Sequence, residues 1–405
     1  MGNAVAHIDE LTTSNRLGPG GEHEARLQGT STRSGVAGLS EGFSVASWRD
    51  ADNAGFIEKW HHLALASATP NPFNEAWFLL PSLRQFDPTR EVMLATHVVR
   101  GELVGLMPML RDRDYHGRPL PHLANWLHSN AFSGEPLVRA DHCASFWQHM
   151  LDWCDRHAHG SLFFHLSGIP ADGAALAALR DIAAKPDRGL RIVETIERAV
   201  LHSGRSPQDH LRLALDKKRR KELNRKRRRL GELGELVLTR HDDDTGLGSW
   251  IDQFLELEQA GWKGAQGSAI SSAPNTEAVF RESLEAAARL GKLQRLAFHL
   301  DGQPVAMLSS FICEPHAFGF KTTFDESLAK LSPGMLLQVE NLAILERRGV
   351  TLSDSCAAPD HPMIGQIWPD RREIVKLSIP IGGRLRRGIG RALTALELRR
   401  GRNRK

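Results

Sequence analysis

Apolar and polar positions along the chain follow two alternating spacings. Segments with apolar residues every three or four positions, typical of amphipathic helices, are followed by short apolar runs typical of strands. In one helical segment, Trp77, Leu80 and Leu83 recur at this spacing. The first cycle of the pattern predicts helices over 51–66, 74–85, 143–157 and 172–184, and strands over 92–99, 103–110, 120–127, 162–166 and 191–201.

A second cycle of helices and strands follows the first. Its clearest hairpin joins two apolar runs through Asp301-Gly302, a dipeptide that favours the tight turn between antiparallel strands. The second cycle predicts helices over 207–230, 247–261, 277–290 and from 333 to the stop at Gly349, and strands over 236–238, 293–300, 305–312, 318–324, 350–353 and 374–379.

The two cycles have the same order of elements, and the hairpin sequence ELVGLM at 102–107 resembles QPVAML at 303–308. Such an echo indicates an internal duplication. We therefore predict an α/β protein with α+β mixed sheets, built from two similar lobes in tandem. The predicted division is a disordered tail over 1–42, a first lobe over 43–201, a second lobe over 202–382 and a basic tail over 383–405.

Composition narrows the class of protein. Hydrophobic residues make up 41% and charged residues 25% of the chain, which is a globular balance. No apolar run is long enough to span a membrane, and the start of the chain lacks the apolar core of a secretory signal. The four cysteines are scattered, which favours free thiols in a reducing compartment, so we predict a cytoplasmic protein. The pairs Cys313/His316 and Cys356/His361 could offer zinc ligands, but the second spacing is loose and we predict no metal.

The net charge of +4 is unevenly distributed. Residues 211–230 hold eleven basic and two acidic residues, and residues 384–405 hold nine basic and one acidic, so the rest of the chain is acidic. A solvated helix is one interpretation of 211–230, and a site for a nucleotide, RNA or lipid headgroup is the other. Two interpretations of 384–405 are open. The segment is either a basic amphipathic helix that contacts a membrane surface or RNA, or a disordered tail.

The helix that begins at Ser332-Pro333-Gly334 carries the strongest candidate chemistry. Ser332 suits the N-cap position, Pro333 suits the first helical position, and Gly334 allows close approach to the backbone. Such a helix start offers free N–H groups to an anion. From spacing alone, a well-capped core helix is the favoured interpretation and phosphate binding the other.

Several motifs together resemble the GNAT superfamily. The segment Phe318 to Asp325, then Leu331-Ser332-Pro333-Gly334 and a strand ending at Asp354, is similar to the double-lobed CelD-type acetyltransferases, relatives of the Fem-type aminoacyl transferases. The first lobe contributes NPFN at 71–74 with Trp77, and VGLMP at 104–108. The resemblance covers about 43–379 and implies two GNAT-like lobes.

The resemblance implies direct attack of an amine on a thioester or ester, with acetyl-CoA or another acyl-CoA as donor and no metal. It implies bases in the order Asp354, His361 and Asp325. It places the donor at Ser309, Ser310, Phe311, Ser332, Pro333, Gly334, Met335 and Leu336, with the first three as oxyanion donors where strands splay. Candidates for contact with anionic substrate groups are Lys217, Lys218, Arg219, Arg225, Trp262 and Lys321.

We therefore predict an N-acyltransferase for an amine acceptor, whether a small molecule, a saccharide or a peptide. The only tyrosine, Tyr115, lies in the first lobe, so no tyrosine serves as general acid in the second. Two alternatives stay open: a non-catalytic protein of GNAT fold that associates with anionic lipid or RNA through 211–230 and 384–405, and a transferase that uses aminoacyl-tRNA. We also expect a peripheral position at the inner membrane surface.

Overall fold

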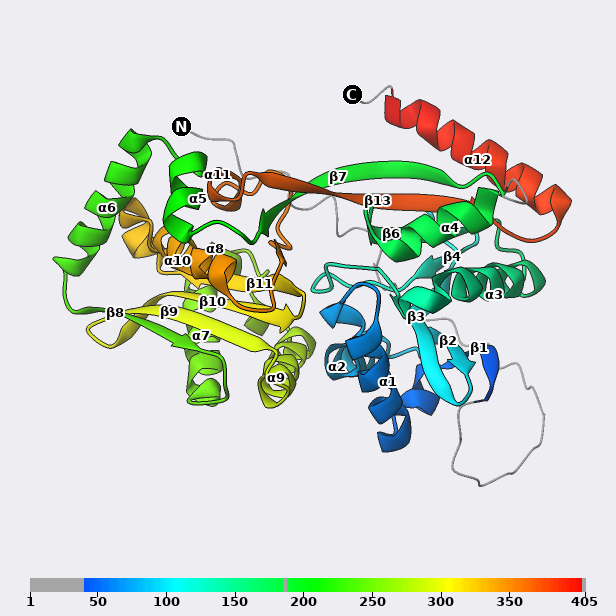
Figure 1. The fold of residues 1–405 in the computed structure, drawn as a ribbon, viewed down its shortest axis with the longest axis horizontal. Coiled ribbons are helices and arrows are strands. Elements are labelled where there is room, and N and C mark those ends of the chain that lie inside the picture. Colours follow the sequence, from blue (N-terminus) through cyan, green and yellow to red (C-terminus); the bar gives the residue numbers. More distant parts are fainter. Residues whose placement is uncertain (1–39, 185–187, 403–405) are drawn as a thin grey trace.

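Two similar sets of strands and helices follow each other along the described chain. The computed structural model describes residues 40–184 and 188–402 (Figure 1). Most of the predicted N-terminal tail therefore lies outside the described residues. The first half of the described chain contains β1 (Gly42–Ser47), α1 (Ala54–Ala66), α2 (Ala76–Phe86), β2 (Met93–Val99), β3 (Glu102–Asp112), β4 (His122–Asn125), β5 (Leu137–Val138), α3 (Cys143–Arg156), β6 (Phe163–Pro170), α4 (Ala174–Ala184) and β7 (Arg191–His202).

The second half repeats this order and ends in a long helix. Its elements are α5 (Pro207–Ala214), α6 (Lys217–Gly231), β8 (Leu236–His241), α7 (Leu247–Ala260), α8 (Trp262–Ala265), α9 (Pro274–Arg289), β9 (Leu293–Leu300), β10 (Gln303–Cys313), β11 (His316–Phe324), α10 (Pro333–Asn341), β12 (Leu352–Asp354), α11 (Ile364–Ile367), β13 (Asp370–Pro380) and α12 (Arg384–Arg402).

All thirteen strands of the described chain join one sheet. Its order is β1-β2-β3-β4-β6-β13-β7-β12-β11-β10-β9-β8, with β5 beside β3. Strands β4 and β6 run parallel in the first lobe, as β11 and β12 do in the second. The predicted mixed α/β fold with two similar lobes is therefore confirmed.

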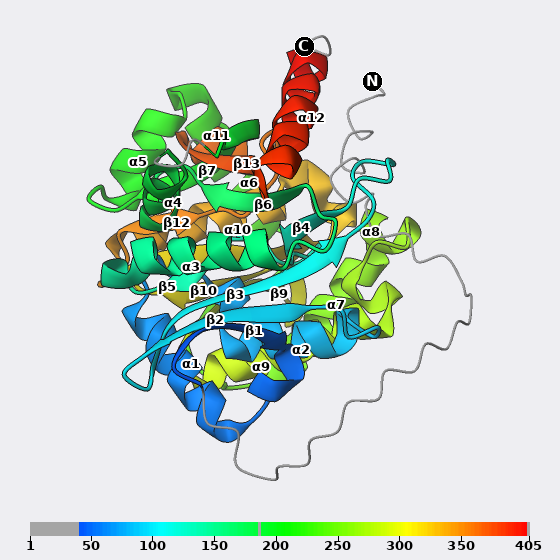
Figure 2. The ribbon, with the colours of Figure 1, turned by 90° about the vertical axis from the view of Figure 1, so that its right-hand side faces the viewer.

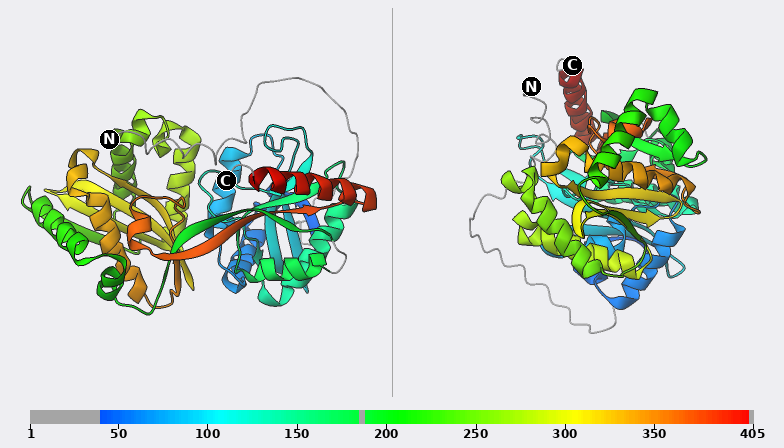
Figure 3. Two further views of the ribbon diagram at one scale, coloured as in Figure 1. Left: turned by 90° about the horizontal axis from the view of Figure 1, so that it is seen from above. Right: turned by 90° about the vertical axis from the view of Figure 1, so that its left-hand side faces the viewer.

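The lobes exchange strands at their junction. Strand β13 comes late in the chain but pairs with β6 of the first lobe, and β7 comes early but pairs with β12 of the second. The two strands also pair with each other from Asp370–Val200 to Ser378–Arg191. Seen from above, they form a ribbon that crosses from one lobe to the other (Figure 3). The division near residue 201 stays a prediction, because this pairing ties both lobes together.

Helices cover both faces of each half of the sheet. In the second lobe α7 and α9 pack on one face and α10 on the other, and in the first lobe α1 and α2 lie opposite α3 and α4. One apolar cluster spans the junction, because Phe73, Trp77 and Phe78 of the first lobe pack with Phe311 and Phe318 of the second. Figure 2 shows the lobes end-on, with α12 projecting from the body.

The predicted helix over 207–230 is two helices. The chain breaks at Leu215, whose backbone is extended, and α6 begins after Asp216, whose carboxylate accepts the N–H of Arg219. Asp216 is a preferred N-cap residue, so a local side-chain bond ends one helix and begins the next. The predicted helix from 333 is also shorter, since its last turns, Leu342–Glu346, are 3-10 helix. For 384–405 the sequence left a helix and a disordered tail open, and the structure has a helix, α12, over Arg384–Arg402.

Candidate donor pocket and lobe junction

The start of α10 has backbone N–H groups that no side chain caps. Ser332 occupies the N-cap position in a left-handed conformation (φ 54°), but its hydroxyl accepts no helix N–H. The hydroxyl instead accepts the Lys226 ammonium at 2.8 Å. The predicted N-cap position is right, while the predicted capping bond is absent. Pro333 has no N–H, so Gly334 and Met335 present the free donors of this first turn, as anion-binding helix starts do.

A pocket of about 380 Å³ opens at this helix start. One face of α6 forms its opposite wall, and the segment before and within α11 closes its side. The pocket is lined by Leu215, Arg219, Glu222, Leu223, Lys226, Phe324, Ala329, Ser332, Gly334, Met335, Pro362, Met363 and Gln366. Space at Gly334 is tight, because an added Cβ would lie 2.9 Å from the Phe324 ring.

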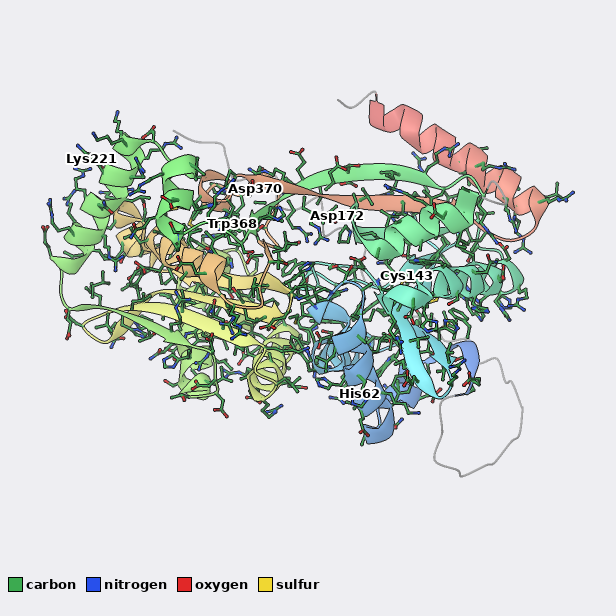
Figure 4. The ribbon with its side chains drawn as sticks, viewed as in Figure 1. His62, Cys143, Asp172, Lys221, Trp368 and Asp370 are labelled. Atoms are coloured by element: carbon green, nitrogen blue, oxygen red, sulfur yellow. The ribbon has the colours of Figure 1, made fainter. Side chains whose placement is uncertain are left out.

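The cations of α6 divide into two groups. Arg219 and Lys226 line the pocket, whereas the exposed residues Lys217 and Lys218 do not. Arg225 pairs with Glu222 at 2.7 Å, which leaves Glu222 with little net charge to oppose an anion. Figure 4 shows Lys221 at the outer edge of the second lobe. Arg219 is therefore the predicted α6 residue that the structure brings to the donor pocket.

Strands β11 and β12 pair over a short stretch only. Their parallel ladder covers three pairs and ends at Phe318–Asp354. The predicted splay at Ser309–Phe311 is wrong, because these residues lie inside β10, which pairs with β9 on one side and β11 on the other. A bulge at Ser309/Ser310 pairs Ser309 with Lys321 and Ser310 with Gly319. The open edge in this region therefore belongs to β11.

Lys321 lies on the face of β11 away from α10. The neighbouring Thr322 accepts a hydrogen bond from Gln338 of α10. Lys321 instead reaches the first lobe, where its ammonium donates to Asn130 Oδ1 at 2.6 Å and lies 5.5 Å from the Phe132 ring. Burial and, to a lesser extent, Lys263 lower the pKa of Lys321 to about 8.

The three predicted bases have different surroundings. Asp354 is buried, pairs with Arg198 at 3.4 Å, and accepts the N–H of Cys356 at 2.8 Å. Asp325 caps the 3-10 helix Glu326–Leu331 by accepting the N–H of Ser327. Both carboxylates therefore stabilise the local backbone, as is common for aspartates at turns and helix caps.

His361 is half-buried in the segment before α11. Its Nδ1 accepts the N–H of Ile364 at 3.3 Å, and burial, followed by Lys263, lowers its pKa. Lys263 is itself paired with Glu258 at 2.7 Å. The imidazole is therefore neutral near pH 7, in the same neighbourhood as Lys263 and Lys321.

Trp262 lies at the edge of this region rather than in the pocket. It begins α8, is 39% exposed, and donates its backbone N–H to Glu326. Burial and Asp354 raise the pKa of Cys356, which disfavours a thiolate nucleophile. Among the described residues, no group of three or more His, Cys, Asp or Glu could hold a metal ion.

Sequence reasoning missed two functional candidates, Lys226 and Asn130. Lys226 follows Arg219 by seven positions and Leu223 by three, so helical spacing alone places the three on one face of α6. Asn130 follows β4 in a long connection of the first lobe, and nothing in the sequence indicates that this connection reaches the other lobe.

Comparisons with known proteins agree with this geometry. Residues 217–361 match the model of the family described as Acetyltransferase (GNAT) domain. This segment of the second lobe is therefore similar to a GNAT domain. The match contains α6, the start of α10 and His361, so the pocket residues from Arg219 to Met335 lie inside the matched segment, whereas Leu215, Pro362, Met363 and Gln366 lie outside it. No curated protein matches the sequence.

Two solved structures are similar to this chain over both of its lobes. FemX is similar with a TM-score of 0.52 at 9% identity, over 80% of this chain and 96% of that one. A conserved protein of unknown function from Bacteroides thetaiotaomicron has a TM-score of 0.52 at 14% identity, over 80% and 97%. At these identities the likeness shows the fold, and its coverage extends over both lobes.

Proposed function

We propose that this GNAT protein is an N-acyltransferase that moves an acyl group from acetyl-CoA or another acyl-CoA to an amine. The observation that carries the proposal is the pocket at the uncapped start of α10. Free N–H groups, the helix dipole and the cations of Lys226 and Arg219 together suit the phosphates of a donor. The apolar wall of Leu215, Leu223 and Met363 suits its less polar arm.

The separation of β11 from β12 gives the acyl group a path from this pocket. We place the donor phosphates at Gly334 and Met335 and the thioester beside β11 beyond Phe318. Backbone N–H groups on the open edge of β11 then stabilise the oxyanion that develops at the carbonyl. This assignment replaces the oxyanion role predicted for Ser309, Ser310 and Phe311.

The proposed reaction needs no covalent enzyme intermediate. The amine nitrogen attacks the thioester carbon, the C–N bond forms as the C–S bond breaks, and the thiolate leaves with one proton. The second proton released by the ammonium passes to His361, which we propose as the base. A neutral imidazole with a lowered pKa stays a proton acceptor to lower pH than a free histidine.

A second donor class is favoured by one observation. Lys217, Lys218 and Lys221 are exposed on α6 outside the pocket, so the positive surface extends further than a CoA needs. An aminoacyl-tRNA would contact such a surface through its backbone phosphates. A non-catalytic GNAT protein that binds RNA would use the same residues.

Release of free thiol from acyl-CoAs of several chain lengths, with a panel of amines, tests the proposal. The expected result is amine-dependent release that saturates in both substrates. Amine-independent background release alone would contradict it. Transfer from charged tRNA, steeply weakened by salt, would support the second donor class.

The partners beyond the acceptor are also part of the proposal. The helix α12 leaves Leu385 88% and Ile389 53% exposed, beside Arg384 and Arg386. A basic helix with exposed apolar side chains suits an anionic membrane surface. No helix in the described part of the chain is long and apolar enough to cross a membrane. We propose a cytoplasmic protein with a peripheral position at the inner membrane surface.

A further inference from the structure

Lys321 stands where an acceptor would meet the acyl group. It follows the last β11–β12 pair, Phe318–Asp354, by three residues. The pocket at α10 lies on one face of this part of the sheet, and the Lys321 side chain lies on the other, toward the first lobe. A group bound at Lys321 therefore approaches the open edge of β11 from the side opposite the donor phosphates.

The ammonium of Lys321 has an incomplete set of partners. Its one hydrogen bond goes to the neutral amide oxygen of Asn130, and the rings of Phe132 and Phe320 each lie 5.5 Å away. An ammonium has three donors, so two remain available. Within the described residues, no carboxylate lies within 4.0 Å of this ammonium.

Three other buried or half-buried lysines of the described chain pair with carboxylates. Lys292 pairs with Glu75 at 2.5 Å, Lys263 with Glu258 at 2.7 Å, and Lys376 with Glu194 at 2.8 Å. The nearby buried pair Arg198–Asp354 is matched in the same way. A partly buried cation without a counter-ion is costly, and a bound anion would offset that cost. Among the described residues, Lys321 therefore differs from these lysines and from Arg198, because its ammonium has no carboxylate partner.

Asn130 adds a second donor of the right kind. Its Oδ1 accepts from Lys321, and its amide nitrogen makes no hydrogen bond to any described residue. One cation and one amide N–H₂ together match the two oxygens and single charge of a carboxylate. A phosphate monoester, with about two charges and three oxygens, would leave charge and acceptors unmatched here.

We infer that Lys321 and Asn130 bind a carboxylate of the acceptor, so that the acceptor is an amine that also carries a carboxylate, such as an amino acid or a peptide. This inference rests on the proposed N-acyltransferase function. The first lobe thereby contributes Asn130 to the substrate site of the second.

Paired acceptors test the inference by kinetics. Thiol release is measured with amino acids and with the corresponding amino acid amides, for the unmodified protein, Lys321→Met and Lys321→Arg. The acid-to-amide ratio of kcat/KM falls about ten-fold in Lys321→Met, mainly through KM, and largely recovers in Lys321→Arg. Comparing this ratio between variants removes the intrinsic difference in reactivity between the two amines. Lys59→Met, on α1, keeps the unmodified ratio.

Binding without turnover separates this inference from the proposed function. Calorimetric titration with the same acids and amides should show acid-specific binding that Lys321→Met loses. If thiol release fails with all acceptors, the acyltransferase proposal is contradicted, and the titration still decides the carboxylate site. Equal binding of acids and amides, or an acid preference that Lys321→Met retains, overturns the inference.

Discussion

The two lobes share a strand plan but differ at the helix that follows the fourth strand. In the second lobe, α10 begins beside Lys226 and lines a pocket. In the first, α3 begins directly after a 3-10 turn that holds Asp141, an exposed carboxylate paired with Arg139 at 3.1 Å. The α3 start also lacks a side-chain cap, but Asp141 lies one position before its N-cap His142, and this negative charge disfavours an anion there. The repeated fold therefore does not repeat the candidate anion site.

The connections before these helices differ as well. In the second lobe a short 3-10 helix, Glu326–Leu331, leads to α10. In the first lobe a longer connection reaches across the junction, where Asn130 bonds to Lys321 and the Phe132 carbonyl accepts from Arg198. Under the proposed function, the second lobe would hold the donor and the first lobe would supply a wall of the acceptor site.

The largest expected effect comes from filling the pocket at the second residue of α10. Gly334→Val places methyl groups against Phe324 and Met363 and should reduce turnover by about a thousand-fold, the scale of a lost binding mode. Ala144→Val changes the second residue of α3 and should leave turnover unchanged. Steady-state thiol release measures both. Equal losses in the two variants would break the distinction between the lobes.

The next largest effect is expected on stability, from the ion pair between Lys292 of the second lobe and Glu75 of the first. Lys292→Ala leaves Glu75 buried without its counter-ion and should lower the free energy of unfolding by about 3 kcal/mol. Lys376→Ala removes the more exposed pair with Glu194 and should lower the free energy of unfolding by less than about 1 kcal/mol. Denaturant unfolding compares the two. A small effect of Lys292→Ala would show that this ion pair contributes little to the stability of the lobe junction.

Stability should also depend on Glu135, in the first-lobe connection. Burial raises its pKa to about 7, opposed by Arg372, from an ordinary value of 4.5. Between these pH values the folded protein holds a proton that the unfolded chain has released, so the free energy of unfolding falls as pH rises. From pH 5 to 8 the unmodified protein should lose about 2 kcal/mol more than Glu135→Gln. Parallel pH profiles would contradict this.

The smallest expected effect separates two cations of one helix. Lys226→Gln removes the charge beside Ser332 and should weaken coenzyme A binding by about ten-fold. Lys221→Gln makes the same change on the outer part of α6 and should have little effect. If both weaken binding of RNA more than of coenzyme A, the tRNA donor is favoured.

Local features of the fold could be predicted from the sequence. The hairpin at Asp301-Gly302 and the start of α10 depend on turn and capping preferences of a few adjacent residues, and both are found. The break at Leu215 was missed, although Asp216 was a readable N-cap signal. The apolar positions Leu211, Leu215 and Leu223 continue a helical spacing across the break, so the pattern predicts one helix.

Long-range features could not be predicted in this way. The exchange of β7 and β13 pairs residues about 180 positions apart, and strand spacing carries no partner information. The same applies to the meeting of Asn130 with Lys321 and of Lys226 with Ser332. The position of Asp354 at a strand end likewise does not reveal its pairing with Arg198, which lies 156 positions earlier.

Hydrogen exchange with coenzyme A tests the central claim, that the donor anion binds the free N–H groups of α10. Saturating coenzyme A should slow exchange of the Gly334 and Met335 amides while leaving Ala144 and Ser145 of α3 unchanged. Protection at α3, or no change at Gly334 and Met335 despite saturation, would contradict the claim.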